Sequence, residues 1–167
     1  NLLAPSRGFY HSILVGNSGL LPRVVIGLFG KRVFYSAFFT VYMLNKFYFS
    51  LAKSDNTVFA TNIKIGDIIE YSKGENVIPV QPVYKFFSGG SSSLRGWNAK
   101  ENGILVNKIN GGTFLFEGSF ELRKRLFPSA EGFMKNLGAA FFVDYGNVWE
   151  THKDFKFSQI DLAIGFG

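Results

Sequence analysis

The sequence predicts an all-β protein built from antiparallel strands. Aromatic residues make up 17% of its 167 residues, and 20 of them are phenylalanine. Aromatic and β-branched residues favour strands. Short polar turns and 19 glycines separate segments in which apolar and polar residues alternate. Because successive side chains of a strand point to opposite faces, this alternation predicts a sheet with two chemically different faces.

The first predicted strand covers residues 9–16, an aromatic and β-branched run. Residues 17–19, Asn-Ser-Gly, end this strand with turn chemistry. Residues 20–31 contain one proline and two glycines. Such residues punctuate regular structure, so this segment is predicted to be a loop.

Residues 33–51 form a long apolar segment with two interpretations. A membrane-spanning helix needs about 20 apolar residues, but this segment carries Asn45 and Lys46 in its interior. It is also rich in the residue types that favour strands. A polar turn at residues 53–56 follows, and residues 57–71 then alternate. We therefore predict a strand that forms a hairpin with residues 57–71, and a membrane helix is the alternative.

Residues 72–110 are predicted to be a single long loop. Its beginning is polar and contains prolines, and its middle reads FFSGGSSSLRGW. Gly89 and Gly90 allow the backbone to adopt positive φ angles at no steric cost. A connection of about 38 residues is much longer than usual, which indicates a functional rather than a passive segment.

Residues 113–125 show the clearest alternation in the chain. Phe114, Phe116 and Phe120 share one face, and Glu117 and Glu121 share the other. In a soluble sheet the Phe face would pack on a core, whereas in a membrane barrel it would face lipid. Two more strands are predicted later in the chain, so the total is about six. The six predicted strands are residues 9–16, 33–51, 57–71, 113–125, 137–149 and 157–167.

Three charged residues form the candidate site. Glu121 and Asp144 project to the same, non-Phe face of two adjacent strands, and Arg95 lies in the long loop. The loop is long enough to fold back over that face. The forked guanidinium of Arg95 could then form charge-assisted hydrogen bonds with both carboxylates.

Two motifs give the chain a family resemblance. Residues 142–146, FVDYG, fit an F-x-D-x-G strand motif, and residues 94–97, LRGW, fit a V-R-G-aromatic loop tip with Leu in place of Val. Together they resemble the Omp85 superfamily. The sequence of the loop is closer to that of BamA- and TamA-type assembly factors than to that of two-partner secretion transporters. The resemblance implies roles for two groups of residues besides the three charges. They are the loop motif Gly89, Gly90, Leu94, Gly96 and Trp97, and the strand motif Phe142 and Gly146.

The resemblance implies a specific architecture. The chain would be part of a sixteen-stranded transmembrane β-barrel in the outer membrane of a bacterium or an organelle. Six strands are too few to close a membrane barrel, since the smallest use about eight. Residues 1–167 would therefore be a C-terminal half without its final strands and without POTRA repeats. Residues 72–110 would enter the lumen, where Arg95 would lock the loop to Glu121 and Asp144.

The resemblance also implies a function without catalysis, cofactors or metals. The protein would insert other proteins into the outer membrane, and its partners would be outer-membrane lipids, unfolded β-barrel clients and accessory assembly subunits. Two alternatives remain at the level of sequence. One is a translocator or passive porin-like barrel, which shares the alternation but does not need the anchored loop. The other is a soluble β-sandwich that acts as a binding module.

Several other chemistries have little support in the sequence. The chain has no cysteine, which excludes disulfides, thiolate metal sites and a cysteine nucleophile. His11 and His152 lack the spacing of metal ligands. The net charge of +6 is not gathered into a nucleic-acid patch, since its densest cluster is residues 123–125. Contact with anionic lipid head groups is a better use of this charge. Glu117 and Glu121 could form a glycosidase-like pair, but no sugar cleft accompanies them.

Overall fold

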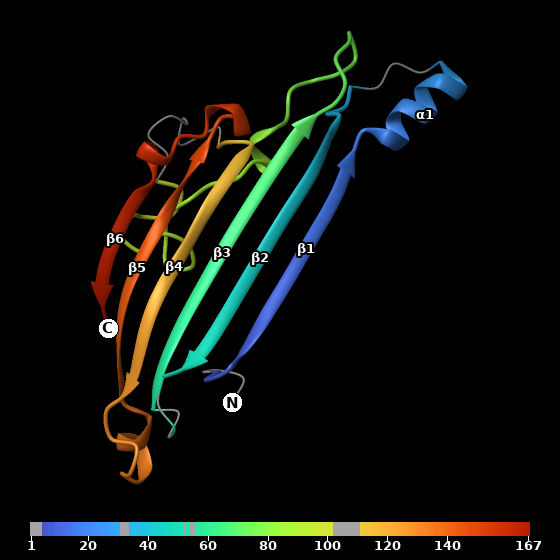
Figure 1. Cartoon of the computed structure of the whole chain (residues 1–167). Coiled ribbons are helices and arrows are strands. Elements are labelled where there is room, and N and C mark those ends of the chain that lie inside the picture. Colours follow the sequence, from blue (N-terminus) through green and yellow to red (C-terminus); the bar gives the residue numbers. More distant parts are fainter. Residues whose placement is uncertain (1–4, 31–33, 52, 54–55, 102–110) are drawn as a thin grey trace.

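A computed structural model describes residues 5–30, 34–51, 53, 56–101 and 111–167 of the chain. Six strands form one antiparallel sheet in sequence order, as Figure 1 shows. The predicted all-β fold is confirmed, and the sheet is not closed, because β1 and β6 lie at its two edges. The strands are β1 (Gly8–Ser18), β2 (Phe38–Ser50), β3 (Thr57–Glu70), β4 (Phe114–Arg125), β5 (Gly138–Trp149) and β6 (Asp161–Phe166).

The ambiguous apolar segment is a strand rather than a helix. β2 pairs antiparallel with β3 along its whole length, from Phe38 opposite Glu70 to Ser50 opposite Val58. The predicted hairpin is therefore confirmed, although β2 begins at Phe38 and not at Val33, which lies outside the described residues. No helix in the described part of the chain is long and apolar enough to cross a membrane.

Two predictions along the chain are wrong: one predicted loop is a helix, and the last strand begins later than predicted. Residues predicted as a loop form the helix α1 (Leu20–Phe29), which projects beyond the end of β1 in Figure 1. Its proline lies in the first turn, where the helix requires no backbone N–H donor. Glycines with positive φ angles precede and follow the helix. The last strand begins at Asp161 rather than at residue 157, because Phe157–Gln159 form a 3-10 turn.

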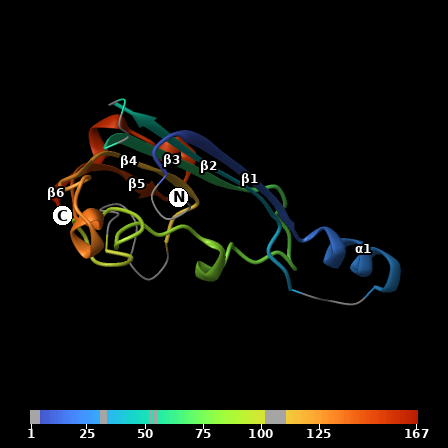
Figure 2. The same cartoon turned by 90° about the horizontal axis from the view of Figure 1, so that it is seen from below.

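The strand register defines two faces and two ends of the sheet. The loop face is the one covered by residues 71–101 and 111–113, the described part of the connection between β3 and β4, which we call the long loop. Figure 2 shows this loop on the inner side of the curved sheet. The open face is the opposite one. The loop end is where the long loop joins the strands, and the hairpin end carries the connections 51–56 and 126–137.

Apolar packing holds the first part of the long loop on the loop face. Val80 is buried against Phe38 and Ile68, and Phe86 packs against this cluster. The Phe86 ring lies over Gly66, where an added Cβ would be 2.5 Å from the ring. The glycine therefore makes room for a side chain of the loop toward the loop end of β3.

The open face is rich in exposed aromatic and aliphatic side chains. Phe120 and Phe141 are 46% and 51% exposed, as expected for an outward-facing surface. Phe114 and Phe116 point to the same face but are half-buried. The ring of Phe155 packs against both of them, with centroids 5.6 and 6.0 Å away. The predicted faces are thus correct, but the connection after β5 covers the loop end of this surface.

A charge placed at mid-height of the open face tests whether that face meets lipid. Ile63 lies on β3 opposite Gly118, near the middle of the apolar stretch. We expect Ile63→Arg to lower the free energy of unfolding by about 2–4 kcal/mol, because arginine is costly near the bilayer midplane. Ile69→Arg, near the loop end, should cost less than about 1 kcal/mol. Denaturant titration of the full-length protein in lipid vesicles measures the free energy of unfolding of both variants. Equal decreases for the two variants would contradict a lipid-facing open face.

Candidate functional site

Two consecutive tight turns place Arg95 at the tip of the long loop. The Ser93 N–H donates to the Gly90 carbonyl at 3.0 Å, and the Trp97 N–H donates to the Leu94 carbonyl at 3.2 Å. Gly90 itself, at φ 100°, donates to the Trp97 carbonyl at 2.9 Å and thereby closes the tip. The turns leave the side chain of Leu94, beside Arg95, fully buried.

Arg95 joins the loop to two adjacent strands. Its Nε and Nη2 donate to the two carboxylate oxygens of Asp144 on β5, at 2.8 and 2.7 Å. Its backbone N–H donates to the same carboxylate at 3.0 Å. Its Nη1 donates to Glu121 on β4 at 3.1 Å. We call these three residues the Arg95 cluster.

The contacts of the Arg95 guanidinium favour its charged form. Asp144 is fully buried, whereas the Arg95 side chain is 27% exposed. Hydrogen bonding to Asp144 is the main effect that raises the pKa of Arg95 above its already high value, so this group stays charged. The guanidinium also stacks on the ring of Phe142, 3.3 Å from the ring centroid. Arg123 donates to the remaining oxygen of Glu121 at 2.6 Å, so this acid interacts with two cations.

Glycines of the loop motif permit close approach to the sheet. A Cβ at Gly96 would lie 2.7 Å from the Ala163 Cβ on β6, and one at Gly89 would lie 2.3 Å from the Asn98 carbonyl oxygen. Gly89 also has a φ of 101°. Trp97 is half-buried within the loop, and Trp149 of β5 is fully buried. Trp149 donates its indole N–H to Gln159, so it packs the connection after β5.

A second cluster, which the sequence interpretation did not anticipate, holds the same loop. Glu117 on β4 is only 4% exposed, and its Oε1 accepts a hydrogen bond from Lys64 Nζ on β3 at 2.7 Å. Its Oε2 accepts hydrogen bonds from Ser88, at 3.0 Å, and from Ser93. Lys64 also donates to the Ser92 carbonyl at 2.7 Å. We call Lys64, Ser88, Ser93 and Glu117 the Glu117 cluster.

Gly146 of the strand motif lies directly opposite Glu117 in the β4–β5 pair. Its φ is 151°, and a Cβ there would lie 2.4 Å from the Cβ of Glu117. The absence of a side chain at position 146 therefore leaves room for the buried Glu117 side chain beside β5. This position connects the strand motif to the Glu117 cluster.

Substitution of Gly146 by alanine should destabilise the sheet and disturb Glu117. A residue with a side chain is rarely found at this φ, and such strain costs about 1–3 kcal/mol. Gly74→Ala is a matched control, because nothing lies within 4 Å of a Cβ at Gly74. Thermal unfolding of the full-length protein in detergent should show a lower midpoint for Gly146→Ala and little change for the control. Similar midpoints for the two variants would contradict this role of Gly146.

The remaining candidates do not form a chemical site. Among the described residues, no group of three or more His, Asp and Glu side chains is placed to hold a metal ion. His11 contacts Asn45 on the open face, and His152 contacts Asp67 at the loop end. Glu117 and Glu121 each pair with cations of the chain and do not face a common cleft. An open hollow of about 580 Å³ lies instead at the hairpin end of β1 and β2.

Comparison with known proteins identifies the family. The model of the Omp85 superfamily domain matches residues 1–167. The chain belongs to the Omp85 superfamily. Among solved structures, the fold is similar to BamA from Haemophilus ducreyi lacking POTRA domains 1–3, with a TM-score of 0.69 and 19% sequence identity. The match covers 97% of this chain and 32% of that BamA chain. The search of curated proteins found no significant match.

Membership of the Omp85 superfamily gives the six-stranded sheet its context. The sheet corresponds to part of the BamA barrel, and it spans about a third of the BamA chain that it matches. Membership of the superfamily and the fold match indicate that the sheet is part of a β-barrel wall. In a closed barrel with this curvature, the loop face would be the inner surface and the open face the outer surface.

Proposed function

We propose that the protein is an Omp85-type factor that inserts β-barrel proteins into the outer membrane, and that the Arg95 cluster locks the long loop inside the barrel. Family membership and similarity to the fold of a BamA barrel support this function. The proposed activity needs no covalent chemistry, cofactor or metal. Its partners are outer-membrane lipids, unfolded β-barrel clients and accessory assembly subunits.

The observation that carries the proposal is the way in which one loop is held by three strands. Lys64 lies on β3, Glu117 and Glu121 lie on β4, and Asp144 lies on β5. All four contact the long loop through hydrogen bonds to its side chains or backbone. A passive pore does not need such an anchor in order to conduct. A barrel that changes its wall during insertion needs a fixed internal support.

The physical basis of insertion is strand addition. An unpaired strand edge presents N–H and C=O groups that an incoming strand can bind, which gives affinity without chemical reaction. In the described sheet, β1 and β6 are the edge strands. We do not assign the insertion seam to either edge, since the superfamily places the seam between the first and last strands of the whole barrel.

Depletion in the cell that makes the protein tests the proposed function. We expect depletion to lower the amount of folded outer-membrane barrels, measured as bands whose gel mobility changes on heating. Re-expression of the full-length protein should restore them. A passive porin would instead leave folded barrels unchanged and slow the uptake of small solutes. A translocator would leave them unchanged and abolish secretion of one cargo.

A further inference from the structure

A continuous row of aromatic rings crosses the open face near the hairpin end. Phe47 and Phe49 on β2 stack with centroids 6.5 Å apart, and Phe49 stacks on Phe59 of β3 at 6.5 Å. Phe59 lies 6.1 Å from Phe120 on β4. We call these four residues the aromatic row. In membrane barrels, aromatic girdles mark the boundary between the hydrocarbon core and the head groups.

Exposed cations lie just beyond the aromatic row. Lys124 and Arg125 end β4, and Lys53 lies in the connection between β2 and β3. At about 3.3 Å per residue, Lys124 lies about 13 Å past Phe120 along the strand. A strand tilt of about 40° reduces this to about 10 Å of height, which reaches the head-group layer.

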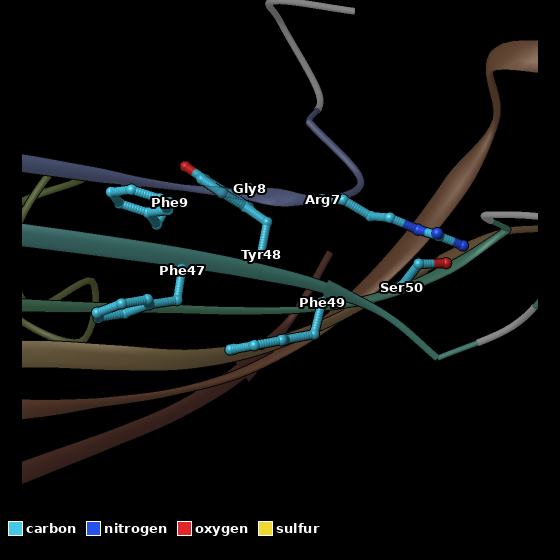
Figure 3. A pocket seen from close by; sticks show the side chains of 7 residues that line it. All are labelled: Arg7, Gly8, Phe9, Phe47, Tyr48, Phe49 and Ser50. Atoms are coloured by element: carbon cyan, nitrogen blue, oxygen red, sulfur yellow. The ribbon is translucent and has the colours of Figure 1, made fainter.

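The hairpin end also exposes apolar groups that suit a membrane boundary. In the connection 126–137, Phe127 is 46% exposed and Phe133 is 76% exposed. The hollow in Figure 3 lies at the same end, with Arg7 and Ser50 beside Phe9, Phe47 and Phe49. The rings of Phe47 and Phe49 point to one side of β2 and that of Tyr48 to the other, so the hollow opens beside the aromatic row.

The two ends of the sheet differ in charge. The described residues of the two connections at the hairpin end contain one acid, Glu131. At the loop end, exposed acids and cations are mixed. Examples are Lys73, Glu75, Lys153, Asp154 and Lys156. Among the described residues, the exposed charges of the hairpin end are therefore mainly cationic, and they lie next to the aromatic row.

We propose that the hairpin end is a docking surface for anionic phospholipid head groups, in which Lys53, Lys124 and Arg125 contact phosphates while the aromatic row lies at the edge of the hydrocarbon core. The three cations lie in two neighbouring hairpins: Lys53 lies between β2 and β3, and the other two end β4. This spacing fits a charged surface better than a single multiply phosphorylated ligand, which would need a pocket. The inference requires a membrane barrel, but it does not depend on the proposed insertion of clients.

Lipid association measured by electron paramagnetic resonance tests the cations. The full-length protein is reconstituted in phosphatidylcholine vesicles that contain spin-labelled phosphatidylglycerol or spin-labelled phosphatidylcholine. We expect severalfold preference for phosphatidylglycerol, with loss of at least half of that preference in the triple variant Lys53→Gln, Lys124→Gln, Arg125→Gln. The control triple Lys73→Gln, Lys153→Gln, Lys156→Gln should keep it. Absence of preference in the unaltered protein, or equal loss in both triples, would overturn the inference.

A depth measurement tests the aromatic row independently of charge. Single cysteines at Phe59 and Ile63, in a full-length background without other cysteines, are labelled with a nitroxide. We expect the label at position 59 to be more accessible to a water-soluble nickel complex and less accessible to oxygen than the label at position 63, which lies about 13 Å further along β3. A label at position 59 that is as deep as the one at 63, or deeper, would show that the row does not mark a membrane boundary.

Discussion

Replacement of Arg95 by glutamate should abolish the assembly of outer-membrane barrels by the full-length protein. The change removes the hydrogen bonds to Asp144 and Glu121 and places a third acid beside them. Removing one partner of a buried ion pair costs about 3–5 kcal/mol. We expect the lower end of this range, because the Arg95 side chain is 27% exposed and water can reach it. The measurement is the recovery of heat-modifiable barrels after depletion of the unaltered protein.

Charge swaps separate a specific lock from general disruption. Arg95→Glu combined with Asp144→Arg restores opposite charges and should recover part of the activity. Arg95→Lys should recover less than wild type, because an ammonium group cannot form the forked contact with Asp144. Lys73→Glu, an exposed position in the same loop, should behave like the unaltered protein. Normal assembly by Arg95→Glu would refute the lock.

Loss of the Glu117 carboxylate should release the same loop by a second route. Glu117→Leu leaves Lys64, Ser88 and Ser93 without their acceptor at a site where the acid is 4% exposed. We expect a loss of about 3–5 kcal/mol, discounted for the 18% exposure of the Lys64 side chain. Limited proteolysis of the full-length protein in vesicles should cleave the long loop faster, and thermal unfolding should begin at lower temperature.

A double-mutant cycle gives the control for Glu117. Lys64→Met combined with Glu117→Leu replaces the ion pair by apolar side chains and should cost less than Glu117→Leu alone, because no buried charge is left unpaired. Glu75→Gln removes an exposed acid of the same loop and should change neither the rate of proteolysis nor the onset of thermal unfolding. If the double variant were as unstable as the sum of its single variants, Lys64 and Glu117 would not act as a pair.

Alternation and motif spacing were sufficient to predict much of the sheet. Phe120 and Asp144 lie on opposite faces because the side-chain period of a strand is two. The sequence interpretation also named Arg95, Glu121 and Asp144, which lie together in the structure. The role of this cluster as a lock stays a prediction, because a contact does not measure function.

Other features depend on information that local patterns do not contain. Lys64 and Glu117 are both on the polar face of their strands, but their contact requires the register between β3 and β4 across the long loop. Pairing across so long a connection is not fixed by turn geometry. The proline and glycine inside α1 favour a loop at the level of sequence, so local patterns do not predict this helix. Flanking glycines at its two ends were the signal that could have found it.

Because of the two clusters, docking of the long loop also depends on the register of β4 and β5. Glu117, Glu121 and Asp144 face the long loop only while β4 and β5 keep their present register. A slip of one residue in either strand would turn its acids to the opposite face. Arg95 would then lose acceptors, and the loop could not settle in its place. Docking of the loop therefore stabilises the correctly aligned wall relative to a wall with a slipped strand.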